Sequence, residues 1–303
     1  VFQKEGGGYD GWCFICNKYE ANPYEDQPPD YKPAFQQKSP EEIQNELDEV
    51  DEFQTHAITS RKLKKEYLQY FGIKTAVSQE DGETPTATYF PYVDEKGKLI
   101  GYKVRLLSEK RMWAVGTTRG AAMFGWELAK NADGPRLYIT EGEYDAVALF
   151  QVLKDKNKDK PQFAAMNPPV VSLPAGSGSV VKTLVKYLPD IRKRFKEVVL
   201  VFDNDEAGKK AVEEALKIIP DALVAELPAK DANDCILEGK SNALFAAVRF
   251  NSSTPKNTRI INGRNLHEKA KKPAEWGIPW PWKGINEKTR GIRTGETIYL
   301  GAG

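Results

Sequence analysis

Carboxylates follow apolar, β-branched runs in three segments of this 303-residue chain. The segments read LYITEGEYDAVAL from Leu137, VVLVFDNDEAGKKAV from Val198 and AKDANDC from Ala229. Because the carboxyl ends of parallel strands meet at one edge of a sheet, acids that lie far apart in sequence can converge there. Such a cluster repels itself unless cations neutralise it, and oxygen ligands favour Mg²⁺ or Mn²⁺. The sequence therefore predicts a paired-metal site for phosphate chemistry, formed by Glu141, Asp145, Asp203, Asp205 and Asp231.

Apolar runs that predict strands alternate from residue 136 with amphipathic runs that predict helices. We expect strands at 137–140, 170–173, 198–202 and 223–227, and helices at 144–153, 180–188, 206–219 and 243–250. This alternation predicts an α/β fold with a mainly parallel sheet flanked by helices. The acids then lie in loops just beyond the strand ends, where open sheets of this type place their functional groups.

The segment before this sheet predicts a mixed α+β subdomain. The SPEE sequence at Ser39 predicts a capped helix start, and we expect residues 57–72 to contain a second helix. We expect the apolar stripe of that helix to pack in the core; it consists of Leu63, Tyr67, Leu68 and Phe71. Two alternating apolar runs joined by DEKGK predict a β-hairpin within residues 86–115.

Positive charge is concentrated between Tyr102 and Arg119, whereas the whole chain has a net charge of only +1. This makes the segment the best candidate for holding phosphates, with Tyr102 or Trp113 stacking on a base. The alternative is a solvated hairpin face. The candidate phosphate-binding and template-binding residues are Lys103, Arg105, Lys110 and Arg111.

The N-terminal segment contains a CxxC pair, Cys13 and Cys16, in an aromatic and glycine-rich context. One such pair supplies half of a zinc ribbon, which needs two further ligands. The other half would lie upstream; the alternatives are a redox pair or coincidence. We do not expect the starting segment, VFQKEGGGYDG, to act as a signal peptide, and the sequence contains no apolar run of the length that crosses a membrane. We expect both ends of the chain to be cut from a longer protein.

The Glu-Gly pair at Glu141 and the DxD motif at 203–205 resemble the pattern of the TOPRIM domain, which occurs in primases, topoisomerases and nucleases. The resemblance is closer to the primase half of the bifunctional primase–helicases of T-seven-type phages. Further similar segments are TSRKLKKEYLQYFGI, GYKVRLLSEKRMWAVGTTRGAAMFG and TGETIYLGAG. The resemblance implies a DNA primase that makes short RNA primers on single-stranded DNA from ribonucleoside triphosphates, in the host cytoplasm.

The resemblance also implies a domain order. It consists of a partial zinc ribbon (1–20), a linker (21–38), an N-terminal primase subdomain (39–134), a TOPRIM subdomain (135–250), a linker containing NGRNLHEKAKK (251–283) and the start of a RecA-like helicase domain (284–303). The implied partners are that helicase domain and a replicative DNA polymerase. We do not expect these residues to hydrolyse nucleotides for unwinding.

The resemblance implies roles for the acids and the cations. Glu141 would be the general acid/base. Asp203 and Asp205 would hold Mg²⁺ or Mn²⁺, and Asp145 and Asp231 would complete the second metal or its water shell. The basic residues would hold nucleotide and template, and Cys13 and Cys16 would bind zinc in the full-length protein. The alternatives are a TOPRIM nuclease, a topoisomerase, for which no tyrosine module is recognisable, and a non-catalytic scaffold of a helicase.

Overall fold

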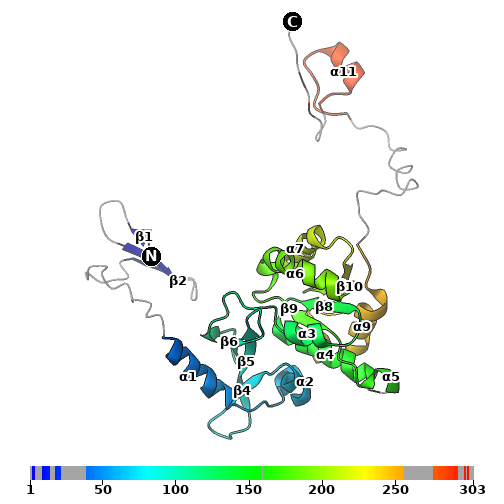
Figure 1. The fold of residues 1–303 in the computed structure, drawn as a ribbon. Coiled ribbons are helices and arrows are strands. Elements are labelled where there is room, and N and C mark those ends of the chain that lie inside the picture. The colour runs from blue at the N-terminus through cyan, green and yellow to red at the C-terminus, as the bar shows by residue number, and fades with distance from the viewer. Residues whose placement is uncertain are drawn as a thin grey trace. The chain divides into compact units, whose positions relative to one another are not determined.

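The computed structural model describes residues 39–158, 160–255 and 276–292, together with 297 and 299, and the backbone of 2–3, 9–13 and 18–21. The chain divides into two units, Val1–Ser253 and Thr254–Gly303, and each is described here by itself. Figure 1 shows the elements of both units. None of the helices in these ranges is long and apolar enough to cross a membrane.

A parallel four-stranded sheet is the centre of the first unit. The strands lie in the order β11-β10-β8-β9, with bounds Leu223–Val224, Glu197–Val201, Arg136–Thr140 and Val170–Ser172. Helices follow the strands: α4 (Glu143–Asn157), α5 (Pro161–Ala164), α6 (Val180–Arg194), α7 (Glu206–Ile218), α8 (Ala232–Leu237) and α9 (Ser241–Ala246). The predicted α/β fold is confirmed, although β11 is shorter than the predicted strand at 223–227.

Successive strand residues point to opposite faces of the sheet, so both faces acquire an apolar layer. Leu137 and Ile139 of β8 belong to the cluster that contains the buried residues of α6 and α7. Tyr138 lies between them in sequence and belongs to the cluster that contains the buried residues of α4. Figure 1 shows α6 and α7 on one side of β8 and α4 on the other. Because both faces are covered, the polar strand ends are the exposed part of the sheet.

An antiparallel sheet precedes the parallel one. Its strands lie in the order β4-β5-β6-β7, with bounds Lys74–Val77, Pro85–Val93, Leu99–Leu106 and Met112–Gly116. The predicted hairpin is β5–β6. Its turn is closed by the Asp94 carboxylate, which accepts from the backbone N–H groups of Lys96 and Lys98 at 2.8 and 2.9 Å. Gly97 supplies the positive φ of +81° that this turn requires.

The first predicted helix is confirmed, and the second lies within residues 57–72 as expected but does not include Leu63. Helix α1 (Pro40–Asp51) begins with a capping box, in which Ser39 and Glu42 bond to each other's backbone N–H. Within 57–72, however, only α2 (Lys65–Tyr70) is α-helical. A 3₁₀ turn, η1 (Thr59–Arg61), and Lys62 at φ +52° precede it, because Ile58 and Leu63 bond to each other as a β-bridge. The four stripe residues are nevertheless buried, as expected.

One hydrophobic cluster joins the two sheets of the first unit. It includes Leu68 of α2, Phe90 and Tyr92 of β5, and Leu149 of α4. The antiparallel sheet is therefore packed on the parallel one through a common core, and this holds β6 in a fixed position relative to the acidic strand ends. The domain boundary expected at 134/135 stays a prediction.

The remaining elements add little to the site. The backbone of β1 (Phe2–Gln3), β2 (Tyr9–Cys13) and β3 (Lys18–Ala21) forms an antiparallel sheet. In the first unit there are also α3 (Trp126–Asn131), the turn η2 (Ser177–Ser179) and a π-helical turn, η3 (Ala247–Asn251). In the second unit, α11 (Lys283–Thr289) follows the exposed Trp276 and Trp282. The Cys13 side chain, Cys16 and the NGRNLHEKAKK segment (262–272), which the sequence predicts to be a short basic helix, lie outside the described residues.

Candidate active site

The ends of two adjacent parallel strands bring the first two acids together. Thr140 of β8 lies opposite Val201 of β10 in the sheet register, and the chain continues to Glu141 and Asp203 respectively. A Glu141 carboxylate oxygen (Oε1) accepts from the backbone N–H of Asp203 at 3.1 Å. The prediction that acids separated by about 60 residues converge is thus confirmed for this pair.

Helix α4 adds Asp145 in its first turn. The Asp145 carboxylate accepts from the backbone N–H of Asn233, at the start of α8, at 3.1 Å. The carboxylates of Asp231 and Asp203 are near enough to oppose its ionisation. Three segments that are far apart in sequence therefore place their acids around one point.

Glycines make this close approach feasible. A Cβ on Gly208, in the first turn of α7, would lie 2.0 Å from the carbonyl oxygen of Asp203 and 2.8 Å from the Glu141 carboxylate. A Cβ on Gly142 would lie 2.8 Å from the Asp145 carboxylate. Glycine is thus required at position 208, where backbone blocks a side chain, whereas a side chain at position 142 would displace the Asp145 carboxylate.

Burial and mutual repulsion disfavour the ionised form of the acids in this cluster. Burial, followed by the charges of Glu141, Asp231 and Asp205, raises the pKa of Asp203 to about 7. Burial also raises the pKa of Glu141, although hydrogen bonds from Asp203 and Ser177 oppose the shift. The pKa of Asp145 is raised well above its usual range, first by burial and then by Asp231 and Asp203. A bound cation would relieve this repulsion.

Two of the predicted metal ligands have a second, structural role. Asp205 caps α7 by accepting from the Gly208 N–H at 2.9 Å, and Asp231 caps α8 by accepting from the Asp234 N–H at 2.7 Å. Each of these two bonds uses one carboxylate oxygen. Asp231 lines the cleft that contains Glu141, whereas Asp205 does not. The role of Asp205 as a metal ligand stays a prediction.

The acids lie in a cleft of about 790 Å³ that also contains several cations. Three of the four predicted basic residues line it, namely Lys103, Arg105 and Lys110. Arg111 does not, and its guanidinium lies 6.0 Å from the centre of the Trp113 ring. Trp113 is 41% exposed and lines the cleft, so it can stack on a base; Tyr102 is 2% exposed and packs in the core against Leu47 and Val50.

Lys103 is held by a buried acid. Its amine lies 2.7 Å from the Glu143 carboxylate, which also accepts from the Tyr92 hydroxyl at 2.6 Å. Glu143 is only 1% exposed. Burial and the negative charge of Glu143 raise the pKa of Tyr92, so the hydroxyl stays protonated as a donor. The pair fixes the direction in which Lys103 reaches the cleft.

Sequence reasoning gave no role to Arg61, Lys230 or Asn233, which also line the cleft. Arg61 donates to the Asn233 side chain at 2.9 Å, and its guanidinium lies 3.9 Å from the centre of the Tyr144 ring. Asn233 returns a bond to the Arg61 carbonyl at 3.0 Å. Lys230 and Asn233 belong to the KDANDC segment, so that motif carried the signal. Arg61 lies 172 positions from Asn233, and no local pattern marked it.

The donor set suits a hard divalent cation, because the available ligands are carboxylate oxygens. Within the described ranges, no group of three or more His, Cys, Asp or Glu side chains is already arranged as a metal site. Glu141, Asp145, Asp203 and Asp231 are the residues whose repulsion such a cation would remove.

A family model described as Toprim-like matches residues 138–236, a range that contains β10, α4, α7 and all five acids. The chain therefore contains a Toprim-like domain.

The chain is also similar to phage proteins. It is 30% identical over 219 residues to the DNA helicase/primase of Enterobacteria phage T3, an alignment that covers 70% of this chain and 36% of that protein. The crystal structure of the primase fragment of the bacteriophage T7 primase-helicase is 27% identical, with a TM-score of 0.53 over 78% of this chain and 89% of that one. The chain thus spans about a third of the length of the phage T3 relative.

A second structure shares the fold. It contains the bacteriophage T7 lagging-strand DNA polymerase with primase domains bound to an RNA/DNA hybrid and dTTP. The matching chain is 32% identical, with a TM-score of 0.52 over 64% of this chain and 91% of that one. The chain thus resembles the primase part of phage primase–helicase proteins.

Proposed function

We propose that this chain is the primase part of a bifunctional phage primase–helicase and synthesises short RNA primers on single-stranded DNA. The observation that carries the proposal is a single cleft lined by both Glu141, Asp203 and neighbouring acids and by Lys103, Arg105 and Lys110. Such a cleft can hold a triphosphate and its cations together. The likeness to phage primase domains supports the same activity.

In the proposed reaction, the 3′-hydroxyl of one ribonucleotide attacks the α-phosphate of the next, and pyrophosphate leaves. Mg²⁺ or Mn²⁺ bound by Asp203, Asp205, Asp145 and Asp231 would supply neutralisation of the phosphate charge. Glu141 lies beside the backbone N–H of Asp203, and its raised pKa suits a group that takes the hydroxyl proton.

The cations and the aromatic residue of the cleft position the nucleotide in this proposal. Lys103, Arg105 and Lys110 bind phosphates of the nucleotide or the template, and Trp113 stacks on a base. The buried Glu143 fixes the direction of Lys103 and so limits where the triphosphate lies. Arg61 and Asn233 hold the start of α8 against Asp145, and in this way they place Asp231.

The wider assignments are also part of the proposal. The helicase domain would belong to the same polypeptide, and a replicative DNA polymerase would receive the primer, in the cytoplasm of the host. Cys13 and Cys16 would bind zinc together with ligands supplied by the full-length protein. These assignments are supported by the likeness to the helicase/primase and to the polymerase complex.

An extension assay tests the activity directly. A short RNA annealed to a single-stranded DNA template is incubated with the chain, labelled ribonucleoside triphosphates and Mg²⁺ or Mn²⁺. Starting from an annealed RNA bypasses the choice of start site. We expect template-dependent extension, and we expect Asp203→Asn to reduce its rate by at least about 100-fold, because a charge essential to metal binding is lost.

The matched control is Asp190→Asn, which makes the same chemical change on the exposed side of α6. It should leave extension unchanged. Cleavage of the template in place of extension would favour a Toprim-like nuclease. Neither activity in wild-type protein would favour a non-catalytic scaffold and overturn the proposal.

A further inference from the structure

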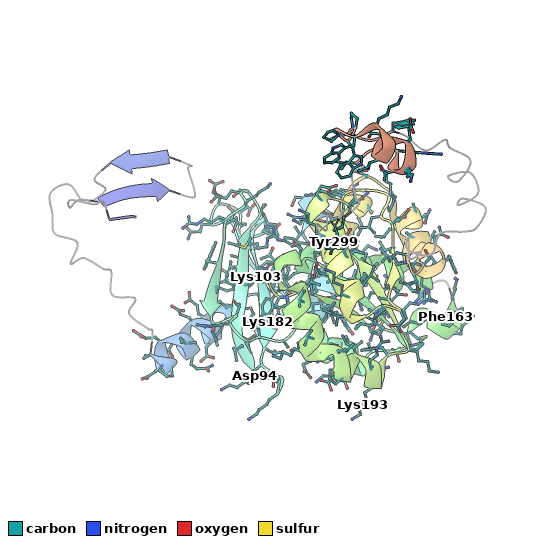
Figure 2. All side chains as sticks on the ribbon, turned by 90° about the horizontal axis from the view of Figure 1, so that it is seen from above. Asp94, Lys103, Phe163, Lys182, Lys193 and Tyr299 are labelled. Carbon is teal, nitrogen blue, oxygen red and sulfur yellow. The ribbon has the colours of Figure 1, made fainter. Side chains whose placement is uncertain are left out.

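A second pocket lies in the Toprim-like domain, at the edge of the sheet opposite to the acidic cleft. It is bordered by Pro135 and Arg136 at the start of β8, whereas Glu141 follows the other end of that strand. The two cavities share no lining residue. Figure 2 shows Phe163, which lines this pocket, far across the unit from Lys103 of the cleft. The pocket is therefore separate from the proposed catalytic machinery.

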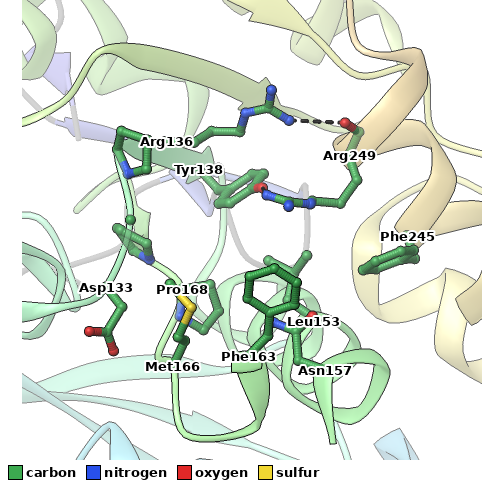
Figure 3. A pocket seen from close by; sticks show the side chains of 13 residues that line it. Asp133, Arg136, Tyr138, Leu153, Asn157, Phe163, Met166, Pro168, Phe245 and Arg249 are labelled. Carbon is green, nitrogen blue, oxygen red and sulfur yellow. Dashed lines mark hydrogen bonds between the residues drawn. The ribbon is translucent and has the colours of Figure 1, made fainter. Parts of the chain in front are cut away.

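The pocket is mainly apolar and has a volume of about 220 Å³, which suits one large side chain. Figure 3 shows how its walls come from different elements, with Phe245 from α9 on one side and Phe163 and Met166 on the other. The apolar lining residues are Tyr138, Leu153, Phe163, Met166, Pro168, Pro169 and Phe245. Phe163 is 39% exposed and the neighbouring Phe250 is 72% exposed, so the apolar surface continues outside the pocket. Exposed apolar surface of this kind commonly marks an interaction site.

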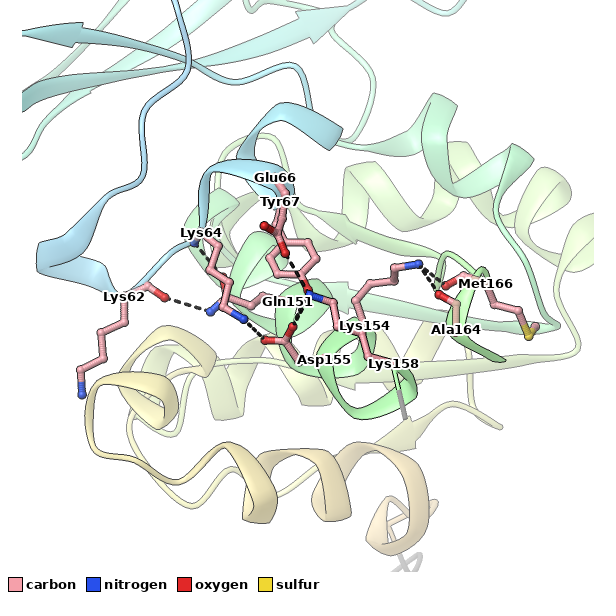
Figure 4. Close-up of polar contacts among 10 residues, drawn as sticks. All are labelled: Lys62, Lys64, Glu66, Tyr67, Gln151, Lys154, Asp155, Lys158, Ala164 and Met166. Atoms are coloured by element: carbon pink, nitrogen blue, oxygen red, sulfur yellow. Dashed lines mark hydrogen bonds and ion pairs between the residues drawn. The ribbon is translucent and has the colours of Figure 1, made fainter. Parts of the chain in front are cut away.

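Side-chain bonds to the backbone hold the walls in place. The Lys154 amine donates to the carbonyl oxygens of Ala164 and Met166 at 3.1 and 2.9 Å, which fixes the loop after α5. Figure 4 shows both bonds. On the opposite wall, the Arg136 guanidinium donates to the Arg249 carbonyl at 3.0 Å. A pocket built in this way needs little ordering when it is filled, which favours binding.

The two arginines of the pocket differ in their partners. Arg136 pairs with the Glu197 carboxylate at 2.7 Å. Arg249 donates to the Tyr138 hydroxyl at 3.3 Å, and no carboxylate among the described residues lies within ion-pair distance of it. The one acid that lines the pocket, Asp133, is engaged with the backbone N–H of Asn167 at 2.8 Å. The pocket thus presents one unneutralised guanidinium beside an apolar cavity.

We propose that this pocket is a docking site for an acidic segment of a partner protein, which inserts one aromatic or large aliphatic side chain and pairs a neighbouring carboxylate with Arg249. Charge complementarity favours a carboxylate, because Arg249 is the cation of the lining that has no carboxylate partner among the described residues. A nucleic-acid strand needs a row of cations for successive phosphates, and the lining contains only Arg136 and Arg249, the first already paired. The proposal does not depend on primase activity.

The three methionines of the chain allow a direct test, because each lies in a different environment. Met166 lines the pocket, Met112 lines the acidic cleft and Met123 is buried in the core. Protein with ¹³C-labelled methionine methyl groups is titrated with a short peptide in which Phe is flanked by two Asp on each side. We expect the Met166 methyl signal to shift saturably while the signals of Met112 and Met123 stay unchanged.

Matched changes in the protein and in the peptide separate the contributions of the ion pair and of the inserted aromatic side chain to binding. Arg249→Glu should weaken the peptide at least about 10-fold, equivalent to about 1.4 kcal/mol. Lys193→Glu, a charge reversal on the exposed side of α6, should have no effect. The peptide with Ala in place of Phe should fail to shift Met166, and the peptide with Asn in place of Asp should bind at least about 10-fold more weakly. Extension activity should be unaffected in Arg249→Glu.

Other results would overturn the proposal. These are a shift of Met112 in place of Met166, no saturable shift up to about 1 mM peptide, or equal binding by the Phe-free peptide. A larger Met166 shift with a single-stranded oligodeoxynucleotide than with the peptide would assign the pocket to a nucleic-acid path instead. The wild-type titration stands by itself, so the test remains decisive even where a variant unfolds.

Discussion

The pKa of a partly or fully buried aspartate is shifted in opposite directions at the two ends of α4. At its start, Asp145 lies among Asp203 and Asp231, and its pKa is raised by burial and by their charges. Near its end, burial also acts on Asp155, but hydrogen bonds from Lys64, Tyr67 and Lys158 prevail and lower its pKa. Figure 4 shows these partners around Asp155. One end contains unbalanced acids, and the other contains an acid with its cations.

The difference indicates which end is structural and which is prepared for a ligand. The Asp155 network joins α2 to α4: Gln151 accepts from the Lys64 N–H at 2.9 Å and donates to the Lys62 carbonyl at 2.9 Å. Its charges are neutralised without any added group. At the start of α4, by contrast, Asp145 and the adjacent Asp203 have no ion-pair partner among the described residues, and acids with raised pKa values concentrate at functional sites.

Glu143 provides the strongest test of this comparison, because it is a paired acid at the unbalanced end. Glu143→Gln would leave Lys103 without its carboxylate partner in a setting where the acid is 1% exposed. We expect a loss of about 3 kcal/mol in the free energy of unfolding, measured by urea denaturation.

The control for Glu143→Gln is the double variant with Lys103→Met, which removes both charges. It should recover part of the lost stability. A change below about 0.5 kcal/mol in Glu143→Gln would show that pairing does not decide the stability of this end.

Removal of the Asp203 charge should have the opposite effect on stability and stabilise the metal-free protein. Its folded pKa of about 7 exceeds the unfolded value of about 3.9. Between these values the folded protein retains a proton that the unfolded chain has lost, so stability falls as pH rises from about 4 to 7. Because Asp203 is partly exposed, we expect only about 1–2 kcal/mol of metal-free stability to be lost.

Thermal unfolding across pH 5–8 measures this effect. Asp203→Asn should be more stable than wild type at pH 8 without metal, and its pH dependence should be flatter. Mg²⁺ should stabilise wild type at pH 8 and have little effect on the variant. A metal-free wild-type protein that gains stability between pH 5 and 7 would contradict the assignment.

The convergence of the acids was predictable from sequence because it follows from topology. Strands that alternate with helices form a parallel sheet, and Glu141 and Asp203 each come directly after a strand of it. The β5–β6 hairpin, which carries Lys103 and Arg105, was likewise predictable from its alternating apolar residues and its turn. In both cases a pattern of neighbouring residues in the sequence determines where the functional side chain lies.

Contacts between distant segments could not be predicted in this way. Tyr102 and Trp113 belong to the adjacent strands β6 and β7, yet Tyr102 packs on α1 whereas Trp113 lines the cleft. The pairing of Lys103 with Glu143 and that of Arg61 with Asn233 depend on how the two sheets pack together. Leu63, which the apolar stripe assigned to the second helix, instead forms a β-bridge with Ile58, a contact that a helical periodicity does not reveal.

The smallest expected effect concerns the balanced end of α4. Tyr67→Phe removes the hydroxyl that donates to Asp155, while the ring remains packed against Phe150. We expect a loss of about 1 kcal/mol, the usual contribution of one such bond. The lowered pKa of Asp155 means that its contribution is present above about pH 4 and is lost only as pH falls below its usual range. The loss measured by urea denaturation should therefore be the same at pH 5 and pH 8, and Mg²⁺ should not alter it. A loss that varied with Mg²⁺ would mean that the two ends of α4 are coupled and that their separation into a structural end and a ligand-binding end is wrong.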